Sequence, residues 1–169
     1  MDKRDLKIFK TSIGYLVKVY GRADFRYGTE FRRFARNLSG DFGKVSIDLK
    51  ECEAMDSTFM GTLAMLGLKG RKQDKPVEML NTSEFCRGLL RGLGLIPLFD
   101  FESREATEVG DLLKITADGD VELATAEAVV EAHKTLVEAD SANAPKFNAV
   151  IDYAEKDLEK LKNKNKEKL

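Results

Sequence analysis

The sequence predicts a mixed α/β fold in which helices pack on a largely parallel sheet. Strand-like and helix-like runs alternate between residues 44 and 101, and this alternation is typical of parallel strands joined by helical crossovers. The run at residues 44–49 has strand-forming residues on both faces, as a central buried strand would. Beyond residue 121, apolar residues recur with helical spacing, so a pair of amphipathic helices is expected after the sheet.

The predicted elements follow one another in a simple order. Two short strand patterns flank Gly14, which predicts an antiparallel hairpin. Pro76 is expected to end the second helix, because the residue before a proline avoids helical backbone. We expect strands at residues 6–9, 15–20, 44–49, 77–80 and 99–101, and helices at about residues 29–38, 62–73 and 84–92.

A helical hairpin is predicted for residues 121–161. Two apolar stripes have helical spacing, and Pro145 between them suits the first turn of the second helix. Neither stripe can remain in water, so both must pack on each other and on the core or on a second subunit. We favour a homodimer and divide the chain into a domain at residues 1–115 and a hairpin extension at residues 116–169. The lysine-rich end from residue 162 is expected to fray.

Ser57 lies at a junction between a strand-like run and a helix. The first N–H groups of a helix lack internal partners and carry the positive end of the helix dipole. A hydroxyl there can cap the helix, and a phosphate attached to it would meet an anion site. Taken alone, this pattern favours a simple cap.

The residues around Ser57 resemble the STAS family, which includes bacterial anti-sigma factor antagonists. The family pattern of a strand, an aspartate-serine loop and a helix is matched by residues 47–49 and by Met55-Asp56-Ser57-Thr58 with Gly61. The resemblance covers about residues 6 to 115. It implies a STAS sheet of four to five mostly parallel strands with helices packed on it, and it does not extend to the C-terminal helical hairpin. Further matching segments lie at residues 19–24, 77–83, 89–95 and 98–99.

The resemblance implies a regulatory binding protein that is switched by phosphorylation. In the family, the residue matched by Ser57 is phosphorylated. The unmodified surface would bind an anti-sigma factor or related serine kinase, phosphorylation would weaken that complex, and a phosphatase would restore it. Phe59 stands where most relatives have glycine, and we expect it to be partly exposed as a contact; the alternative is that it tucks under the hairpin. The expected partner-binding residues are Asp24, Asp56, Ser57, Thr58, Phe59 and Met60.

Two alternatives remain open for the function. The chain could be an oligomeric scaffold in which the hairpin drives association and the serine loop is a vestigial cap. It could also be a small-molecule-binding STAS module without a phosphorylation switch.

Composition indicates a globular protein that does not bind nucleic acid. Of its 169 residues, 43% are hydrophobic and 34% charged, and the formal net charge is −1. Binding phosphate backbones requires concentrated lysine and arginine, whereas Arg32, Arg33 and Arg36 are expected to be the solvated face of the first helix. The sequence has no apolar run long enough to span a membrane and no signal-peptide pattern at its start. We therefore expect a cytoplasmic protein.

We expect no metal, no cofactor and no catalysis. Cys52 and Cys86 lack Cys-x-x-Cys spacing, and His133 is the only histidine, so metal ligands would be too few. Cys86 is expected in the core and Cys52 at the surface. Asp24 and Asp56 could form an acid–base pair, but no nucleophile or oxyanion donor accompanies them. His133 lies in an apolar stripe and is expected to be a packed side chain.

Overall fold

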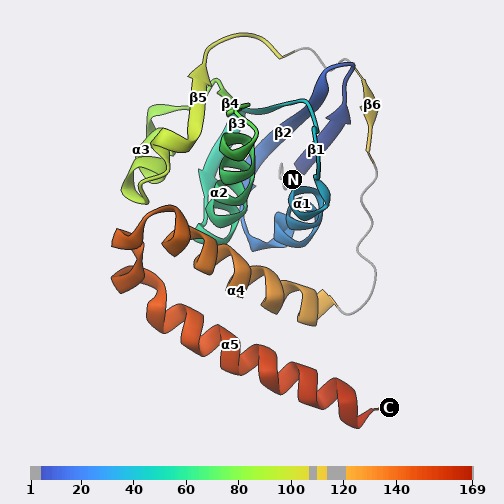
Figure 1. The fold of residues 1–169 in the computed structure, drawn as a ribbon, viewed down its shortest axis with the longest axis vertical. Helices are drawn as coiled ribbons and strands as arrows, with labels where there is room; N and C mark the ends of the chain where they lie inside the picture. The colour runs from blue at the N-terminus through green and yellow to red at the C-terminus, as the bar shows by residue number, and fades with distance from the viewer. Residues whose placement is uncertain (1–4, 107–109, 114–120, 169) are drawn as a thin grey trace.

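The computed structural model describes residues 5–106, 110–113 and 121–168. In this part of the chain, a six-stranded sheet is covered by helices, and a C-terminal pair of helices packs at one end of this arrangement (Figure 1). None of the described helices is both long and apolar enough to cross a membrane.

The sheet is mostly parallel, as predicted. Its strand order is β5-β4-β3-β2-β1-β6, with parallel pairing from β2 through β5 and antiparallel pairing of β1 with β2 and with β6. The expected four to five strands are joined by a two-residue sixth strand, too short to leave a sequence pattern. The strands are β1 Asp5–Lys10, β2 Gly14–Ala23, β3 Lys44–Met55, β4 Val77–Leu80, β5 Phe99–Glu102 and β6 Asp111–Leu112.

Three helices pack on this sheet: α1 Phe25–Asn37, α2 Ser57–Lys72 and α3 Glu84–Gly92. The prediction for α1 was wrong at its start, because the helix begins at Phe25 rather than near residue 29. The side chain of Asp24 accepts a hydrogen bond from the backbone N–H of Arg26, and this N-cap starts the helix earlier than its apolar stripe indicates. The core between sheet and helices includes Ile47, Leu49 and Leu63, which are fully buried.

The predicted helical hairpin is confirmed as α4 Val121–Ala139 and α5 Ala144–Glu167, which are joined by a 3-10 turn at Ser141–Asn143. Pro145 lies in the first turn of α5, as expected. The expected fraying from residue 162 is wrong, since α5 stays helical to Glu167. The predicted domain boundary between residues 115 and 116 lies outside the described residues.

The hairpin docks on the rest of the same chain. Figure 1 shows α4 lying across the ends of α1 and α2, with α5 on its outer side. Glu131 of α4 forms an ion pair with Arg32 of α1, so Arg32 is not part of a fully solvated face. At the turn, the buried amide of Asn143 donates to the carbonyl oxygen of Leu93 at 2.9 Å. These contacts provide cover for α4 within one chain, and the homodimer remains a prediction.

Candidate functional site

Two helix N-termini meet at one end of the sheet. Ala23 at the end of β2 pairs with Met55 at the end of β3, so the next residues, Asp24 and Asp56, enter α1 and α2 side by side. Asp56 bridges the two helices. Its Oδ1 accepts the backbone N–H of Phe59 at 2.8 Å, and its Oδ2 accepts the backbone N–H of Phe25 at 2.9 Å. The carboxylate thus satisfies a free donor on each helix.

The surroundings of Asp56 include groups that raise the pKa of its carboxyl and groups that lower it. Burial raises the pKa of its carboxyl, and the nearby Asp24 carboxylate raises it further. The hydrogen bonds from Phe59 and Phe25 act against this, and so does the proximity of His133. Asp56 braces the loop through these hydrogen bonds and is the N-cap of α2.

Ser57 is therefore the first residue of α2 rather than its cap. Its Oγ lies 2.9 Å from Nε2 of His133, which comes from α4. Nδ1 of the same ring lies 2.6 Å from the carbonyl oxygen of Val129. A carbonyl oxygen can only accept, so Nδ1 carries a proton, and in the neutral ring Nε2 accepts the hydroxyl proton of Ser57.

α4 approaches α2 very closely beside this contact. A Cβ added to Gly61 would lie 2.4 Å from the carbonyl oxygen of Ala132 and 2.6 Å from its Cβ. The small side chains of Gly61 and Ala132 allow the helices to come this near. His133 is only 4% exposed, and the ring of Phe147 from α5 packs against it with centroids 5.1 Å apart. The serine hydroxyl is consequently held against the C-terminal extension, and Ser57 is half-buried.

The exposure expected for Phe59 is wrong. Phe59 is 0% exposed and stacks on Phe31 of α1, with ring centroids 5.0 Å apart. Thr58 and Met60 are also buried. In the first turn of α2, Thr58, Phe59 and Met60 therefore face the interior, whereas Ser57 is half-buried. Phe59 lies in the core of its own chain against α1, so its burial, though not a contact with the hairpin, agrees with the alternative considered from the sequence.

An exposed aromatic residue near the site was not singled out from the sequence. Phe25 is 48% exposed and opens α1, directly after Asp24. The guanidinium of Arg26 lies over its ring at 6.0 Å, and Arg26 also forms an ion pair with Asp24 at 2.6 Å. Its only signal in the sequence is an aromatic residue next to a capping aspartate.

His133 was noted from the sequence only as a packed side chain, and its contact with Ser57 was missed. It is packed, as expected, but a polar group in an apolar stripe needs a partner once it is buried. The sequence does not say which residue that partner is, since Ser57 and His133 are 76 positions apart.

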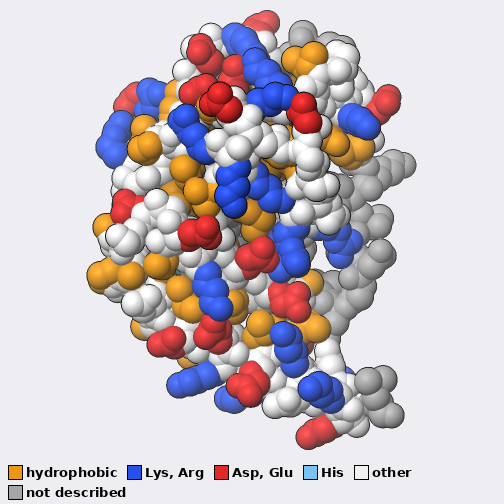
Figure 2. Space-filling view, viewed as in Figure 1, with side chains coloured by type: hydrophobic (Ala, Val, Ile, Leu, Met, Phe, Trp, Pro, Cys, Tyr) orange, Lys and Arg blue, Asp and Glu red, His pale blue; other side chains and the backbone are white. Residues whose placement is uncertain are grey.

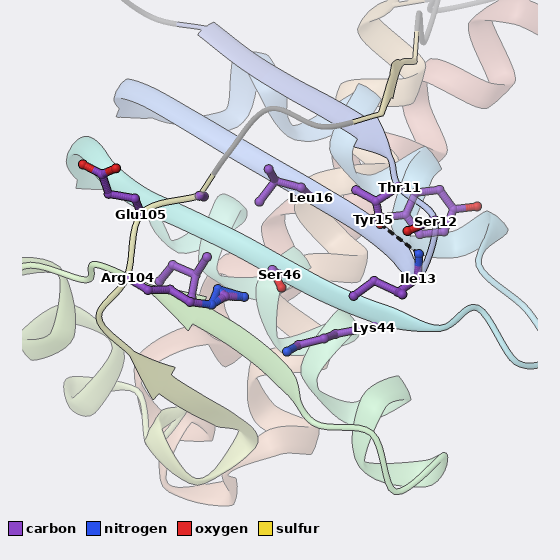
Figure 3. Close-up of a pocket in the computed structure, with 11 residues that line it drawn as sticks. Thr11, Ser12, Ile13, Tyr15, Leu16, Lys44, Ser46, Arg104 and Glu105 are labelled. Atoms are coloured by element: carbon purple, nitrogen blue, oxygen red, sulfur yellow. Dashed lines mark hydrogen bonds between the residues drawn. The ribbon is translucent and has the colours of Figure 1, made fainter.

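A pocket of about 340 Å³ opens near the β1–β2 turn, next to β3 (Figure 3). Figure 3 shows Lys44 and Arg104 reaching toward Ser46 from opposite sides. Both cations pair with the carboxylate of Glu78, at 3.3 Å for Lys44, and the hydroxyl of Ser46 donates to the same carboxylate at 3.0 Å. Apolar lining comes from side chains that include Leu16, Leu80 and Ala106.

The distribution of charged side chains on the surface is consistent with the formal net charge of −1. Figure 2 shows acidic and basic side chains interspersed over the visible face. Among the described residues, no group of three or more histidine, cysteine or acidic side chains is placed to hold a metal ion.

Comparison with known proteins finds similarity in the fold and little similarity in the sequence. No family model and no curated protein matches the chain. Among solved structures, it is similar to the anti-sigma factor antagonist SpoIIAA in its unphosphorylated form, with 15% identity, 62% of this chain and 91% of that chain covered, and a TM-score of 0.49. It is also similar to a sulfate transporter family protein from Wolinella succinogenes, with 16% sequence identity and a TM-score of 0.45. That match covers 73% of this chain and 86% of the other. The observed order of elements agrees with the STAS-type fold that the sequence resemblance implies.

Proposed function

We propose that this chain is a phosphorylation-switched regulatory binding protein of the anti-sigma factor antagonist kind, and that Ser57 is the modified residue. One observation carries the proposal: the Ser57 hydroxyl lies at the start of α2, where the N-termini of α1 and α2 meet. The partner would be an anti-sigma factor or related serine kinase in a bacterial cytoplasm. The partner would supply the ATP, and a phosphatase would reset the switch.

The electrostatics of the loop support this switch. A phosphate on Ser57 would add a charge of about −1.5 to −2 beside Asp24 and Asp56. The helix N-terminus stabilises the anion within the chain. At the surface, the combined negative charge would repel an acidic face of the partner and would fill space that the unmodified loop leaves open. Phosphorylation would therefore weaken the complex.

The burial pattern narrows the surface that meets the partner. Asp56 and Ser57, which are half-buried, remain in the proposed contact surface, and Phe25 takes the anchoring role that the sequence suggested for Phe59. The surface contact expected for Asp24 is wrong, because its carboxylate is buried and caps α1. An exposed aromatic can fill a pocket on a partner. Thr58, Phe59 and Met60 would instead hold the loop in shape from beneath.

The Ser57–His133 contact has a mechanical role in this proposal. A serine hydroxyl beside a histidine could be a nucleophile and its base, but His133 lies in the packing between α2 and α4 and against Phe147. We infer that the pair holds α4 over the loop rather than performing catalysis. A kinase would reach Ser57 in a form in which this end of α4 has moved away.

Phosphate transfer to Ser57 is the first expected result. Incubation of the full chain with a candidate kinase and ATP, followed by phosphopeptide mapping, should place the phosphate on Ser57. Ser57→Ala should stay folded and bind constitutively, with a stability loss of about 0.5–1.5 kcal/mol for the hydrogen bond to His133. Ser57→Asp should bind the partner more weakly.

Phosphate confined to other residues would contradict the assignment of the site. Equal partner affinity for the unmodified protein, Ser57→Ala and Ser57→Asp would remove the switch from the proposal. Phe25→Ala serves as a separate probe of the surface. It should weaken partner binding and, because the partner is the kinase, slow the phosphorylation of Ser57 without moving the phosphate to another residue.

The pocket supports a second candidate function, the binding of a small molecule with an apolar body and an anionic group. Lys44 and Arg104 pair with the carboxylate of Glu78 next to apolar lining, where an anionic group could take over one of these cations. Glu105 also lines the pocket and adds a second carboxylate. Native mass spectrometry of the purified protein should then show a bound mass that is lost in Arg104→Ala. A protein without added mass, in which medium-chain fatty acids cause no shift, would count against this candidate.

A further inference from the structure

The two cysteines of the chain, Cys52 and Cys86, meet in the interior although they are 34 positions apart. Cys52 lies on β3 and Cys86 lies on α3, and both are buried free thiols. The thiol of Cys86 donates to the carbonyl oxygen of Cys52, with Sγ 3.7 Å from that oxygen. The burial expected for Cys86 is confirmed, whereas the exposure expected for Cys52 is wrong.

The surroundings make the two thiols unequal. Cys86 lies in the first turn of α3, where its backbone N–H donates to the capping hydroxyl of Ser83 at 3.1 Å. The hydrogen bond from the Cys52 thiol lowers the pKa of Cys86, and Ser83 lowers it further, against the effect of burial. The hydrogen bond to Cys86 and burial raise the pKa of Cys52. The two pKa values therefore shift in opposite directions, so Cys86 ionises more readily than Cys52 and is the better nucleophile of the pair.

Cys52 also lies at an irregular point of the sheet. The register between β2 and β3 shifts there, because Gly21 pairs with Cys52 while the next residue, Arg22, pairs with Ala54. Sγ of Cys52 lies 3.4 Å from the carbonyl oxygen of Ala54. Such bulges bend a strand and redirect its side chains. Here the irregular segment brings the Cys52 side chain against α3.

We propose that Cys52 and Cys86 form a redox-sensitive modification site, in which a hydroperoxide converts the two thiols into a disulfide that links β3 to α3. The Cys86 thiolate attacks one peroxide oxygen, the O–O bond breaks, and the leaving hydroxide takes a proton to become water. The resulting sulfenic acid is attacked by Cys52, which loses its proton as the S–O bond breaks and a second water leaves. Two thiols and one hydrogen peroxide give one disulfide and two waters.

This site does not depend on the phosphorylation proposed for Ser57. The two are connected through the strand, since Cys52 lies four positions before Asp56 on the segment that leads into α2. The exposures of 6% for Cys52 and 0% for Cys86 imply a slow reaction that favours small oxidants.

The test uses the folded, full-length protein and hydrogen peroxide. After oxidation, the protein is denatured, alkylated with N-ethylmaleimide and weighed intact. Both alkylation sites should be lost together, with a mass decrease of about 2 Da in place of the two adducts. Digestion without reductant should yield a peptide that joins Cys52 to Cys86, and dithiothreitol should restore both thiols.

Single-cysteine variants identify the order of the steps. In Cys52→Ser, Cys86 should stop at a sulfenic acid that dimedone traps, whereas in Cys86→Ser the remaining thiol should react more slowly. The wild-type measurement decides the proposal even if a variant fails to fold. Thiols that both remain alkylatable, oxidation of one cysteine alone, disulfides between chains, or an internal disulfide that forms only in denatured protein would each overturn it.

Discussion

Replacing Phe59 by alanine is expected to lower the free energy of unfolding by about 3–5 kcal/mol. Phe59 is fully buried and stacks on Phe31, so the substitution removes a large side chain and leaves a cavity between α1 and α2. Urea denaturation of the two proteins under the same conditions measures this difference. A loss this large would be a substantial fraction of the stability of a domain of this size.

Phe85 provides the matched control for this experiment. It is the same residue type, it also lies in the first turn of a helix, and it is 62% exposed. Phe85→Ala should change the free energy of unfolding by less than about 0.5 kcal/mol. Equal effects of the two substitutions would contradict the burial of Phe59 and would restore the exposed contact expected from the sequence.

Replacing Gly61 by alanine is expected to destabilise the docking of α4. The new Cβ would lie 2.4 Å from the backbone oxygen of Ala132, and a backbone atom can give way only if the helix moves. We expect a loss of about 1–3 kcal/mol in the free energy of unfolding, typical of overpacking. Hydrogen exchange should become faster in α4, including at His133.

Gly61→Ala also tests whether the packing of α4 controls the phosphorylation of Ser57. If α4 covers Ser57, Gly61→Ala should increase the initial rate of Ser57 phosphorylation by the candidate kinase. Faster exchange in α4 without faster phosphorylation would contradict the covering role that we propose for the Ser57–His133 contact.

Gly88 serves as the control for the loss of a helical glycine. It lies in α3, and a Cβ added there would meet nothing within 4 Å. Gly88→Ala should raise the free energy of unfolding by up to about 1 kcal/mol, because alanine is the better helix former. It should leave α4 and the phosphorylation rate unchanged.

Local signals were sufficient to predict much of the fold. β4 Val77–Leu80 and α3 Glu84–Gly92 have the bounds expected from the sequence, since both are enclosed by clear turn and capping residues. The start of α1 was missed because its cap, Asp24, precedes the first residues of the apolar stripe. Caps act through hydrogen bonds to the nearest two or three N–H groups, so they can extend a helix beyond its hydrophobic pattern.

The sequence predicted where the candidate site lies along the chain, but it did not predict which side chains surround it. The sequence places Ser57 and Asp56 at the start of a helix, and the structure agrees. Ser57 was expected to be open to a partner, and it is instead hydrogen-bonded to His133. A phenylalanine near a loop has the same local pattern whether it is exposed or buried, so the burial of Phe59 depended on its long-range contact with Phe31 of α1.

The sequence by itself determined the strands, the helices and the two apolar stripes of the C-terminal hairpin, because these depend on spacing and caps within a few residues of one another. Only the tertiary structure decided what the first stripe covers. Spacing shows that a helical face must be buried, but the choice of surface depends on shape, and here the close contact of Gly61 with Ala132 brings His133 onto Ser57. That long-range fit turns an apparently open serine loop into a half-buried one.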